Sequence, residues 1–470
     1  MKVLGRLAAH GHQAFLVGGG VRDLLLGKAP KDFDVGTDAT ISEVRSIFRN
    51  SRIIGRRFKL VHVFFRGGKT IEVSTFRASN PLPLVENQGE DSADENASSE
   101  SFVENPSLDA SMDGGSYEER NESNEEANSE STESENVDLS QVKTLGSDNV
   151  YGDPESDAYR RDLTINGLFY NIYDKSIIDY VGGIEDLKNG VIRVIGDPEV
   201  RFKEDPVRIL RAIRHSARTE FFIEPNTWQA IKNSRSLLAL CPPARVYDEF
   251  CREVVGGYSS RSLSLMSESG ILPELIASLS DIANEDFSKT ELAQTLRKVD
   301  VIAKAGSPLP LEVVLAALTV DVLSPEKVSE ITGIRLPLCE ALWNSECPLP
   351  ADLGSVHEMR EEVSKGLFAL YNPLRMTRRV RDLLADILVQ RALLVTVALG
   401  AEDRAKEAKG EGAKHAFKLL RLLCQGENAD QTCNYWFIKS ASRSRSDESP
   451  SRRRDGYRGN NRNRGRGRQI

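Results

Sequence analysis

The sequence predicts an α/β head followed by a long all-α region. Two observations favour this fold class. Between residues 14 and 76, short apolar or β-branched runs alternate with segments of helical spacing and with glycine turns, which is typical of a sheet covered by helices. From about residue 200 onward the spacing is almost wholly helical, and proline or glycine interrupts it at residues 242–243, 256–257, 308–310, 337 and 348–350.

The elements of the head follow in order along the chain. Apolar residues at helical spacing favour helices, and runs rich in β-branched and aromatic residues favour strands. A glycine cluster at 18–20 ends the first strand in a tight turn. The predicted helices span residues 2–13, 21–27 and 41–50, and the predicted strands span residues 14–17, 32–37, 53–55, 60–65 and 70–76.

Composition divides the chain further. Residues 86–135 contain 17 acidic side chains against one arginine and hardly any aromatic ones, a composition that cannot bury a core and predicts disorder. Residues 443–468 are rich in arginine, serine and glycine, which predicts a disordered RNA-binding tail or a merely solvated terminus. We predict a head at 1–80 and 137–199, a disordered acidic insert at 81–136, a helical neck at 200–290, a helical body and tail at 291–437, and the disordered basic terminus at 438–470.

The same composition excludes several classes of protein. No run of about 18 apolar residues predicts a membrane span, and the six cysteines are scattered without the spacing of zinc ligands. No presequence is visible at the start of the chain. We therefore expect an intracellular protein without zinc, disulfides or a membrane partner, whose compartment (organelle, nucleus or cytoplasm) and oligomeric state the sequence leaves open.

Two aspartates in the second predicted strand indicate chemistry. Asp32 and Asp34 lie two residues apart, and such residues of a strand point to the same face. Two close carboxylates favour a cation between them, and Mg²⁺ prefers hard oxygen ligands. The pair predicts a magnesium site, although an isolated pair of this kind is usually a solvated acidic edge. Glu72 is either a third acid or an ordinary exposed strand glutamate.

Residues around this pair predict contacts to phosphates and to a base. Gly19 and Arg22 follow a strand and open a helix, where backbone N–H groups attract phosphate oxygens, although most glycine clusters are only turns. An aspartate held beside an arginine can read the edge of a base. One aspartate and three arginines recur at helical spacing: Asp205, Arg208, Arg211 and Arg214. The same pattern also fits a surface helix with ion pairs between its own side chains.

Five motifs resemble one family in their order along the chain. The segments are LVGGGVRDLLLG, KDFDVGT, RRDLTINGLFY, DYVGGIEDLKNGVIR and EDPVRILRAIR. They are similar to the motifs of the superfamily of class II tRNA nucleotidyltransferases and bacterial-type poly(A) polymerases. The resemblance covers roughly residues 15–275. It implies a polymerase-β-like nucleotidyltransferase head followed by helical neck, body and tail regions.

The resemblance also implies roles for single residues. Asp32 and Asp34 match metal-binding carboxylates, Glu72 matches the third acid, and Asp162 lies in an active-site motif. His215 stands where many relatives have phenylalanine, which would alter packing near the base. Asp205 and Arg208 match the pair that reads the base. The positions that match nucleotide contacts are Gly19, Arg22, Arg161, Asp205, Arg208, Arg211 and Arg214.

The implied reaction is attack of an RNA 3′-hydroxyl on the α-phosphate of ATP, with Mg²⁺ as the cofactor. Three further segments, IIGRRFKLVHVFF, DNVYGDPESDAYRRD and CPPARVYDEF, resemble the poly(A) polymerase branch. Addition of AMP to RNA 3′ ends is therefore favoured over addition of CCA to tRNA. A non-catalytic RNA-binding protein, or an adaptor whose Arg/Ser tail is switched by phosphorylation, remains as an alternative.

Overall fold

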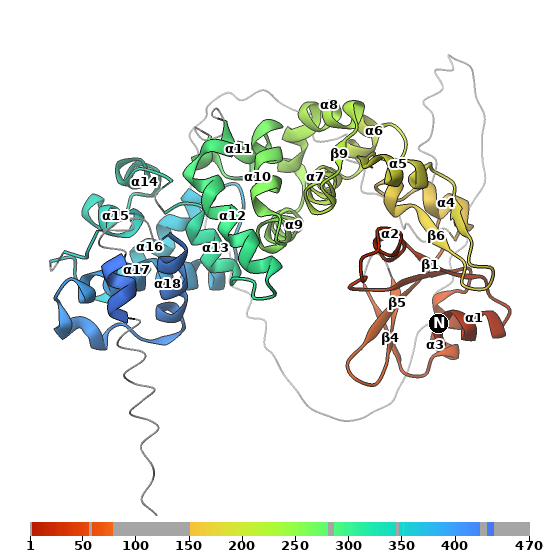
Figure 1. Cartoon of the computed structure of the whole chain (residues 1–470), viewed down its shortest axis with the longest axis horizontal. Helices are drawn as coiled ribbons and strands as arrows, with labels where there is room; N and C mark the ends of the chain where they lie inside the picture. Colours follow the sequence, from red (N-terminus) through yellow and green to blue (C-terminus); the bar gives the residue numbers. More distant parts are fainter. Residues whose placement is uncertain are drawn as a thin grey trace, which may run out of the picture. The chain divides into compact units, whose positions relative to one another are not determined.

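The computed structural model describes most of the predicted head and helical region (Figure 1). The predicted acidic insert and the Arg-rich terminus lie outside the described residues. The described ranges are 2–55, 59–78, 151–280, 286–320, 322–344, 347–350, 352–423 and 430–436.

The head is built on one seven-stranded mixed sheet with the strand order β3-β4-β5-β2-β1-β6-β7. Strands β2 and β5 are parallel, and all other neighbouring strands are antiparallel. The strands are β1 (Ala14–Val17), β2 (Asp34–Thr37), β3 (Ser51–Ile54), β4 (Leu60–Phe64), β5 (Thr70–Thr75), β6 (Leu168–Tyr170) and β7 (Ile177–Asp179).

Helices α1 (Lys2–Ala9) and α3 (Ile41–Ile47) cover one face of this sheet. Leu7 and Val44 on these helices form a common core with Val35 of β2, Val61 of β4 and Val73 of β5. Successive side chains of a strand point to opposite faces, so the neighbours of these valines point away from α1 and α3. The remaining elements of the head are α2 (Gly19–Leu25), α4 (Pro154–Tyr159), the 3₁₀ turn η2 (Thr164–Asn166) and α5 (Gly183–Asn189).

The rest of the described chain is helical apart from a parallel pair of two-residue strands, β8 (Val191–Ile192) and β9 (Phe222–Ile223). One apolar core runs through this region from Leu163 to Leu423. The helices are α6 (Pro198–Glu204), α7 (Val207–Thr219), α8 (Pro225–Ser234), α9 (Pro243–Val255), α10 (Ser259–Glu268), α11 (Ile271–Leu275), α12 (Glu291–Lys304), α13 (Leu311–Ala317), α14 (Pro325–Thr332), α15 (Leu336–Trp343), α16 (Val356–Leu370), α17 (Arg378–Ala398) and α18 (Gly410–Leu423), with 3₁₀ turns η3 (Arg235–Leu240), η4 (Ala277–Leu279), η6 (Phe287–Lys289) and η7 (Glu402–Lys406).

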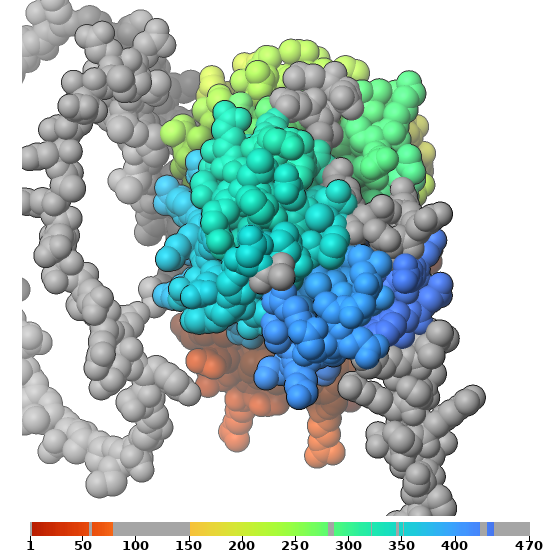
Figure 2. All heavy atoms as spheres, turned by 90° about the vertical axis from the view of Figure 1, so that its left-hand side faces the viewer, coloured from red at the N-terminus to blue at the C-terminus, as the bar shows by residue number. Residues whose placement is uncertain are grey.

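Hydroxyl side chains begin several of the later helices. Thr290, Ser324, Ser355 and Thr377 each accept a hydrogen bond from a backbone N–H in the first turn of the helix that follows, which satisfies donors that have no partner within the helix. Residues of α14 to α18 form much of the surface seen in Figure 2, in cyan to blue. In the described ranges, none of the helices combines the length and apolar character needed to cross a bilayer.

The predicted fold class is confirmed, and several element boundaries are corrected; helix α3, for example, ends at Ile47 instead of residue 50. The first helix ends at Ala9 instead of residue 13, because Gly11 adopts a left-handed φ of 86°. The second helix begins at Gly19, so two of the three clustered glycines lie within its first turn. Strand β2 begins at Asp34, and Asp32 therefore precedes the strand in which we had placed it.

Candidate active site

Two carboxylates meet on the face of the sheet opposite α1 and α3. Asp34 of β2 lies in register with Glu72 of the parallel strand β5, so their side chains point to the same face. Since Val35 and Val73 point into the core under α1 and α3, both acids point away from that core. Asp32 is exposed and precedes β2, so the strand ladder does not align it with Asp34. The predicted third acid thus lies beside Asp34 in the sheet.

The acids repel one another. Burial is the first cause that raises the pKa of Asp34 to about 6, and the charge of Glu72 is the second. Asp32 adds a smaller upward contribution, while the Arg161 guanidinium acts in the opposite direction. Glu72 also lies 3.1 Å, Oε1 to Nε2, from His62 on β4. The carboxylate of Asp34 therefore lies in a negative electrostatic potential, which a bound cation would neutralise.

The donor set of these acids fits a magnesium ion. All three offer carboxylate oxygens, which Mg²⁺ prefers and binds while keeping several waters. Within the described ranges, no three His, Cys, Asp or Glu side chains are gathered closely enough to hold a metal ion. Asp32, Asp34 and Glu72 would have to draw together around a bound ion, and the exposed Asp32 has the room to do so.

The glycine turn before α2 is shaped by its contacts. Gly18 adopts φ 71° and ψ −139°, a backbone conformation that L side chains rarely tolerate. A Cβ atom at Gly18 would lie 3.1 Å from Nη1 of Arg161. Arg161 pairs with the buried Asp157 at 2.8 Å and lies over the ring of Phe169 at 5.2 Å from its centroid. The glycine thus lets an arginine lie directly over the turn, beside Asp34.

Arg22 lies inside the protein, because only 1% of the residue is exposed. Its guanidinium donates to Asp23 Oδ1 at 2.7 Å, to Asn166 Oδ1 at 2.6 Å and to His215 Nδ1 at 3.1 Å. Asp23 also accepts from Arg218 of α7 at 2.6 Å. Burial, followed by the charge of Arg22, holds the pKa of His215 well below its usual range, so its imidazole is neutral and accepts from Arg22. Arg22 therefore joins α2 to α7, and its contact with a nucleotide stays a prediction.

A second, partly buried pair joins the head to α7. Asp162 accepts from Arg211 Nε at 2.6 Å, from Asn166 Nδ2 at 3.2 Å and from the backbone N–H of Leu163 at 2.8 Å. Burial acts to raise the pKa of Asp162, but the charge of Arg211, the hydrogen bonds from Arg211 and Asn166, and the other groups around the carboxylate together outweigh burial and hold this pKa far below the usual range. Asp162 is therefore an ionised partner of Arg211 within the described structure.

Arg214 of α7 turns toward α9. Its Nε donates to Glu249 Oε2 at 2.9 Å, and Glu249 also lies 3.8 Å from Arg211 and 2.9 Å from Arg252. Only 6% of the Glu249 side chain is exposed. One buried acid thus holds three arginines from two helices.

The predicted base-reading residues do not share one helical face. Helix α7 begins at Val207, and Asp205 is extended with φ −151° and ψ 92°, because Pro206 disfavours the helical conformation of the residue before it. Asp205 pairs with Arg245 of α9 at 2.9 Å, and Arg208 pairs with Glu204 at 2.8 Å. The sequence prediction that Asp205 continues the face of α7 is wrong.

Several residues that shape the site were not predicted from the sequence. Glu249 and Arg245 lie in the segment CPPARVYDEF, Asp157 lies in α4, and Asn166 lies in η2. The available signal was an acid on the apolar face of an amphipathic helix, where Glu249 lies with Val246 and Phe250, since a buried acid requires a partner. Nothing in the sequence marked His62, which is opposite Glu72 only by strand register.

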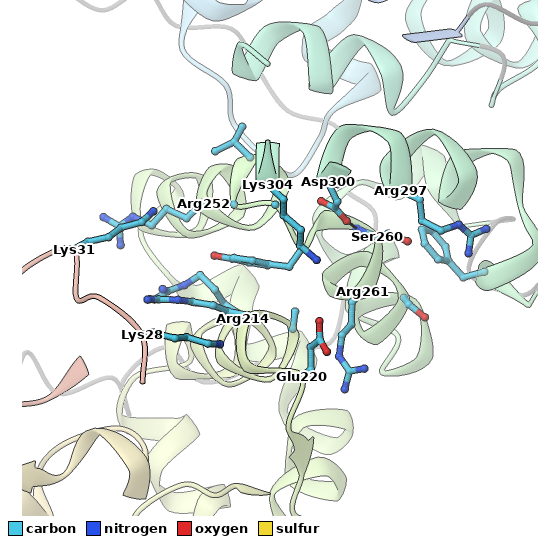
Figure 3. A pocket seen from close by; sticks show the side chains of 18 of the residues that line it. Lys28, Lys31, Arg214, Glu220, Arg252, Ser260, Arg261, Arg297, Asp300 and Lys304 are labelled. Atoms are coloured by element: carbon cyan, nitrogen blue, oxygen red, sulfur yellow. Dashed lines mark hydrogen bonds between the residues drawn. The ribbon is translucent and has the colours of Figure 1, made fainter. Parts of the chain in front are cut away.

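A basic groove of about 1030 Å³ opens beside Asp32. Figure 3 shows cationic side chains around it from the loop after α2 and from α7, α9, α10 and α12. Eight lining residues are basic, namely Lys28, Lys31, Arg214, Arg218, Arg252, Arg261, Arg297 and Lys304, and three are acidic, namely Asp32, Glu220 and Asp300. The groove is therefore suited to a polyanion.

One buried acid lies next to this groove. Glu253 of α9 is fully buried, accepts from the Ser262 hydroxyl through Oε2, and has no hydrogen-bond partner for Oε1. Burial raises its pKa to about 8, while Ser262 and Arg214 act to lower it. At neutral pH Glu253 therefore carries a proton.

Replacement of Glu253 by glutamine is expected to stabilise the protein at pH 8 and to change little at pH 5. The folded-state pKa near 8 lies above the usual 4.5, so this carboxyl contributes full stability at low pH and loses it as pH rises from 4.5 to 8. The gain at pH 8 is on the order of a few kcal/mol. Chemical unfolding at both pH values measures it, and an equal effect at pH 5 and pH 8 would contradict the assignment.

The head therefore combines a mixed sheet, acids on the face opposite α1 and α3, and a glycine turn at the start of a helix, which together define a nucleotidyltransferase head. Residues 14–193 match the family described as the poly A polymerase head domain. Residues 220–282 match the family described as the probable RNA- and SrmB-binding site of polymerase A. The chain belongs to the superfamily that contains poly(A) polymerases and CCA-adding enzymes.

Relatives of both kinds are similar to this chain. Poly(A) polymerase I of Escherichia coli is 40% identical over 286 residues, which cover 61% of this chain and 51% of the relative. A CCA-adding enzyme of Bacillus licheniformis is 31% identical over 275 residues, which cover 58% and 54%. The match thus spans about half the length of these relatives.

The fold of a solved CCA-adding enzyme covers nearly the whole chain. The crystal structure of the Bacillus stearothermophilus enzyme in complex with CTP has a TM-score of 0.51 at 20% identity, and the match covers 94% of this chain and 81% of that one. At this identity the likeness establishes the fold alone.

Proposed function

We propose that this protein is a template-independent RNA nucleotidyltransferase that adds AMP from ATP to RNA 3′ ends. The observation that carries the proposal is the placement of Asp34 beside Glu72, with Asp32 at the mouth of a groove lined by eight cations. Carboxylates suit metal ions that bind phosphates, and basic grooves suit the backbone of a single strand.

The relatives favour adenylation over CCA addition. The match to Poly(A) polymerase I is 40% identical, against 31% for the CCA-adding enzyme of B. licheniformis. Two of the three segments that resemble the poly(A) polymerase branch contribute Arg161 and Arg245, which pair with the buried Asp157 at 2.8 Å and with Asp205 at 2.9 Å. CCA addition to tRNA is the second candidate, because proteins of that name are relatives over a similar length.

Asp32 and Asp34, with Glu72 as a third acid, would hold Mg²⁺. When bound, the ion supplies charge neutralisation at the reacting phosphate and a more nucleophilic 3′-hydroxyl. The side chains of the protein contribute by positioning the two reactants. Arg161 lies over the glycine turn beside Asp34, where it can pair with phosphate oxygens, and placing the two reactants in line lowers the barrier without further chemistry from side chains.

The first experiment extends two labelled RNAs and reads the products on a sequencing gel. One is a generic RNA and the other is a tRNA that lacks its terminal CCA, and each is incubated with ATP alone and with ATP plus CTP. Long A-tails on both RNAs with ATP alone are expected. Three-nucleotide addition restricted to the tRNA and dependent on CTP would identify a CCA-adding enzyme, and no addition to either RNA would refute nucleotidyl transfer.

Replacement of Arg208 by alanine is expected to relax nucleotide selection more than RNA binding. Arg208 lies beside Glu204 at the start of α7 and contacts no buried acid, so its loss removes donors for a base edge and little stability. We expect the ratio of kcat/KM for ATP to that for CTP to fall about 10-fold, which is ~1.4 kcal/mol.

The matched control is Arg252→Ala, on α9 and 60% exposed in its side chain, which should leave the ratio unchanged. An ATP preference that survives Arg208→Ala intact would remove Arg208 from base recognition.

A further inference from the structure

Two glycines shape the turn between α9 and α10 around one aromatic ring. A Cβ atom at Gly256 would lie 2.6 Å from Cε1 and 2.5 Å from the hydroxyl oxygen of Tyr258, closer than real side chains approach one another. Gly257 adopts a φ of 85° and packs against Ala303 and Lys304 of α12. The Tyr258 ring therefore rests against bare backbone, in a cradle that a side chain at Gly256 would fill.

This ring lines the basic groove and is partly exposed there. The Arg214 and Arg218 side chains of α7 act electrostatically on its hydroxyl, and Lys304 and Arg261 line the same groove from α12 and α10 (Figure 3). The arrangement places one aromatic surface among several cations.

The acids of the groove do not cancel these cations. Asp300 accepts hydrogen bonds from the backbone N–H groups of Ser259 and Ser260 at 2.6 and 3.0 Å, so it caps the start of α10. Glu220 is the residue that ends α7, and Asp32 is the proposed metal ligand. Arg214 and Arg218 are paired with Glu249 and Asp23. The positive charge left for a phosphate backbone around Tyr258 therefore comes from Lys304 and Arg261.

We propose that Tyr258 stacks on an unpaired base of the RNA substrate upstream of its 3′ end. This inference rests on the proposed function and adds the residue that holds the strand before its 3′ end. An aromatic side chain among cations is the arrangement that binds single strands without base preference. A base inside a duplex is already stacked on its neighbours and does not reach such a ring. Because the same groove contains Asp32, the 3′ end lies toward the acids and the stacked base lies before it.

The test measures RNA binding apart from chemistry. Fluorescence anisotropy gives the Kd of the full chain for a labelled 12-nucleotide RNA, and for a series in which one abasic nucleotide is moved stepwise from the 3′ end. We expect one or two positions at which the abasic substitution raises Kd roughly 5- to 150-fold, the range for loss of one stacked base. A hairpin RNA with a blunt 3′ end should bind more weakly than the same hairpin with a single-stranded tail.

Variants then assign that position to Tyr258. With Tyr258→Leu, the penalty for the abasic nucleotide should fall to about 1- to 2-fold, because the ring that the base contacts is absent. Tyr258→Phe keeps the ring and should keep the penalty. Gly256→Ala leaves the tyrosine in the chain but fills its cradle, and it should reduce the penalty as Tyr258→Leu does.

Tyr173→Leu is the matched control, because Tyr173 is 60% exposed on the head and lies outside the groove, and it should behave as wild type. An abasic series without a sensitive position in the wild-type chain, or a sensitive position unchanged in Tyr258→Leu, would overturn the inference. Both outcomes are measured as the Kd for RNA and do not depend on catalysis. Failure of nucleotide addition in the gel experiment would instead overturn the proposed function.

Discussion

Replacement of Asp34 by asparagine is expected to reduce nucleotide addition by roughly 10³-fold or more, which is ~4 kcal/mol of transition-state stabilisation. Asp34 carries the partly buried carboxylate on the face of the sheet opposite α1 and α3, beside Glu72. Asparagine has nearly the same shape but no negative charge, so it weakens cation binding without leaving a cavity. Single-turnover extension of a labelled RNA at saturating ATP and Mg²⁺ measures the effect.

The same change should leave the protein as stable as wild type or more so. The pKa of Asp34 is raised to about 6, first by burial and then by Glu72, so in the metal-free protein its charge opposes folding above that pH. Asp38→Asn is the control, since Asp38 is exposed and pairs only with His12 at 3.4 Å in the described structure. An Asp34→Asn variant with a wild-type melting temperature and more than a tenth of wild-type activity would remove Asp34 from the metal site.

Replacement of Arg211 by methionine is expected to destabilise the folded protein by about 1–3 kcal/mol. Arg211 is the principal charged partner of Asp162, with Nε 2.6 Å from Oδ2, and its side chain is 35% exposed. Its removal leaves the Asp162 carboxylate with the hydrogen bonds from Asn166 and Leu163 but without its paired guanidinium. Urea unfolding followed by circular dichroism measures the loss.

Two variants separate this role from a direct contact with the nucleotide. Arg252→Met removes an arginine that is also bonded to Glu249 but is 60% exposed, so it should cost less than about 1 kcal/mol. Asp162→Asn combined with Arg211→Met removes both charges and should recover part of the stability. If Arg211→Met unfolds at the same urea concentration as wild type but loses ATP binding, the guanidinium serves the nucleotide and not Asp162.

The fold class could be predicted from local pattern alone. Strand and helix periodicity identified every strand of the sheet up to Thr75, since short β-branched runs between glycine turns seldom form anything other than strands. Boundaries were less accurate, because they depend on single backbone conformations. Gly11 ends α1 through its positive φ, and Pro206 separates Asp205 from α7.

The site was predictable as a set of residue types but not as a set of partners. Asp32, Asp34 and Glu72 were identified from spacing and from resemblance, yet only the parallel pairing of β2 with β5 places Glu72 beside Asp34. Arginines predicted to face a nucleotide are bonded to side chains far along the chain, as Arg22 is to the amide of Asn166 and Arg211 is to the carboxylate of Asp162.

The sequence by itself determined the order of strands and helices and the residues able to carry out the chemistry, because periodicity, turn residues and charge are local properties of the chain. The tertiary structure decided which charged side chains pair with one another. An ion pair is buried only where packing excludes water from both charges, so the partners of Asp162, Arg22 and Glu249, and the cradle of Gly256 under Tyr258, were set by packing between helices and sheet.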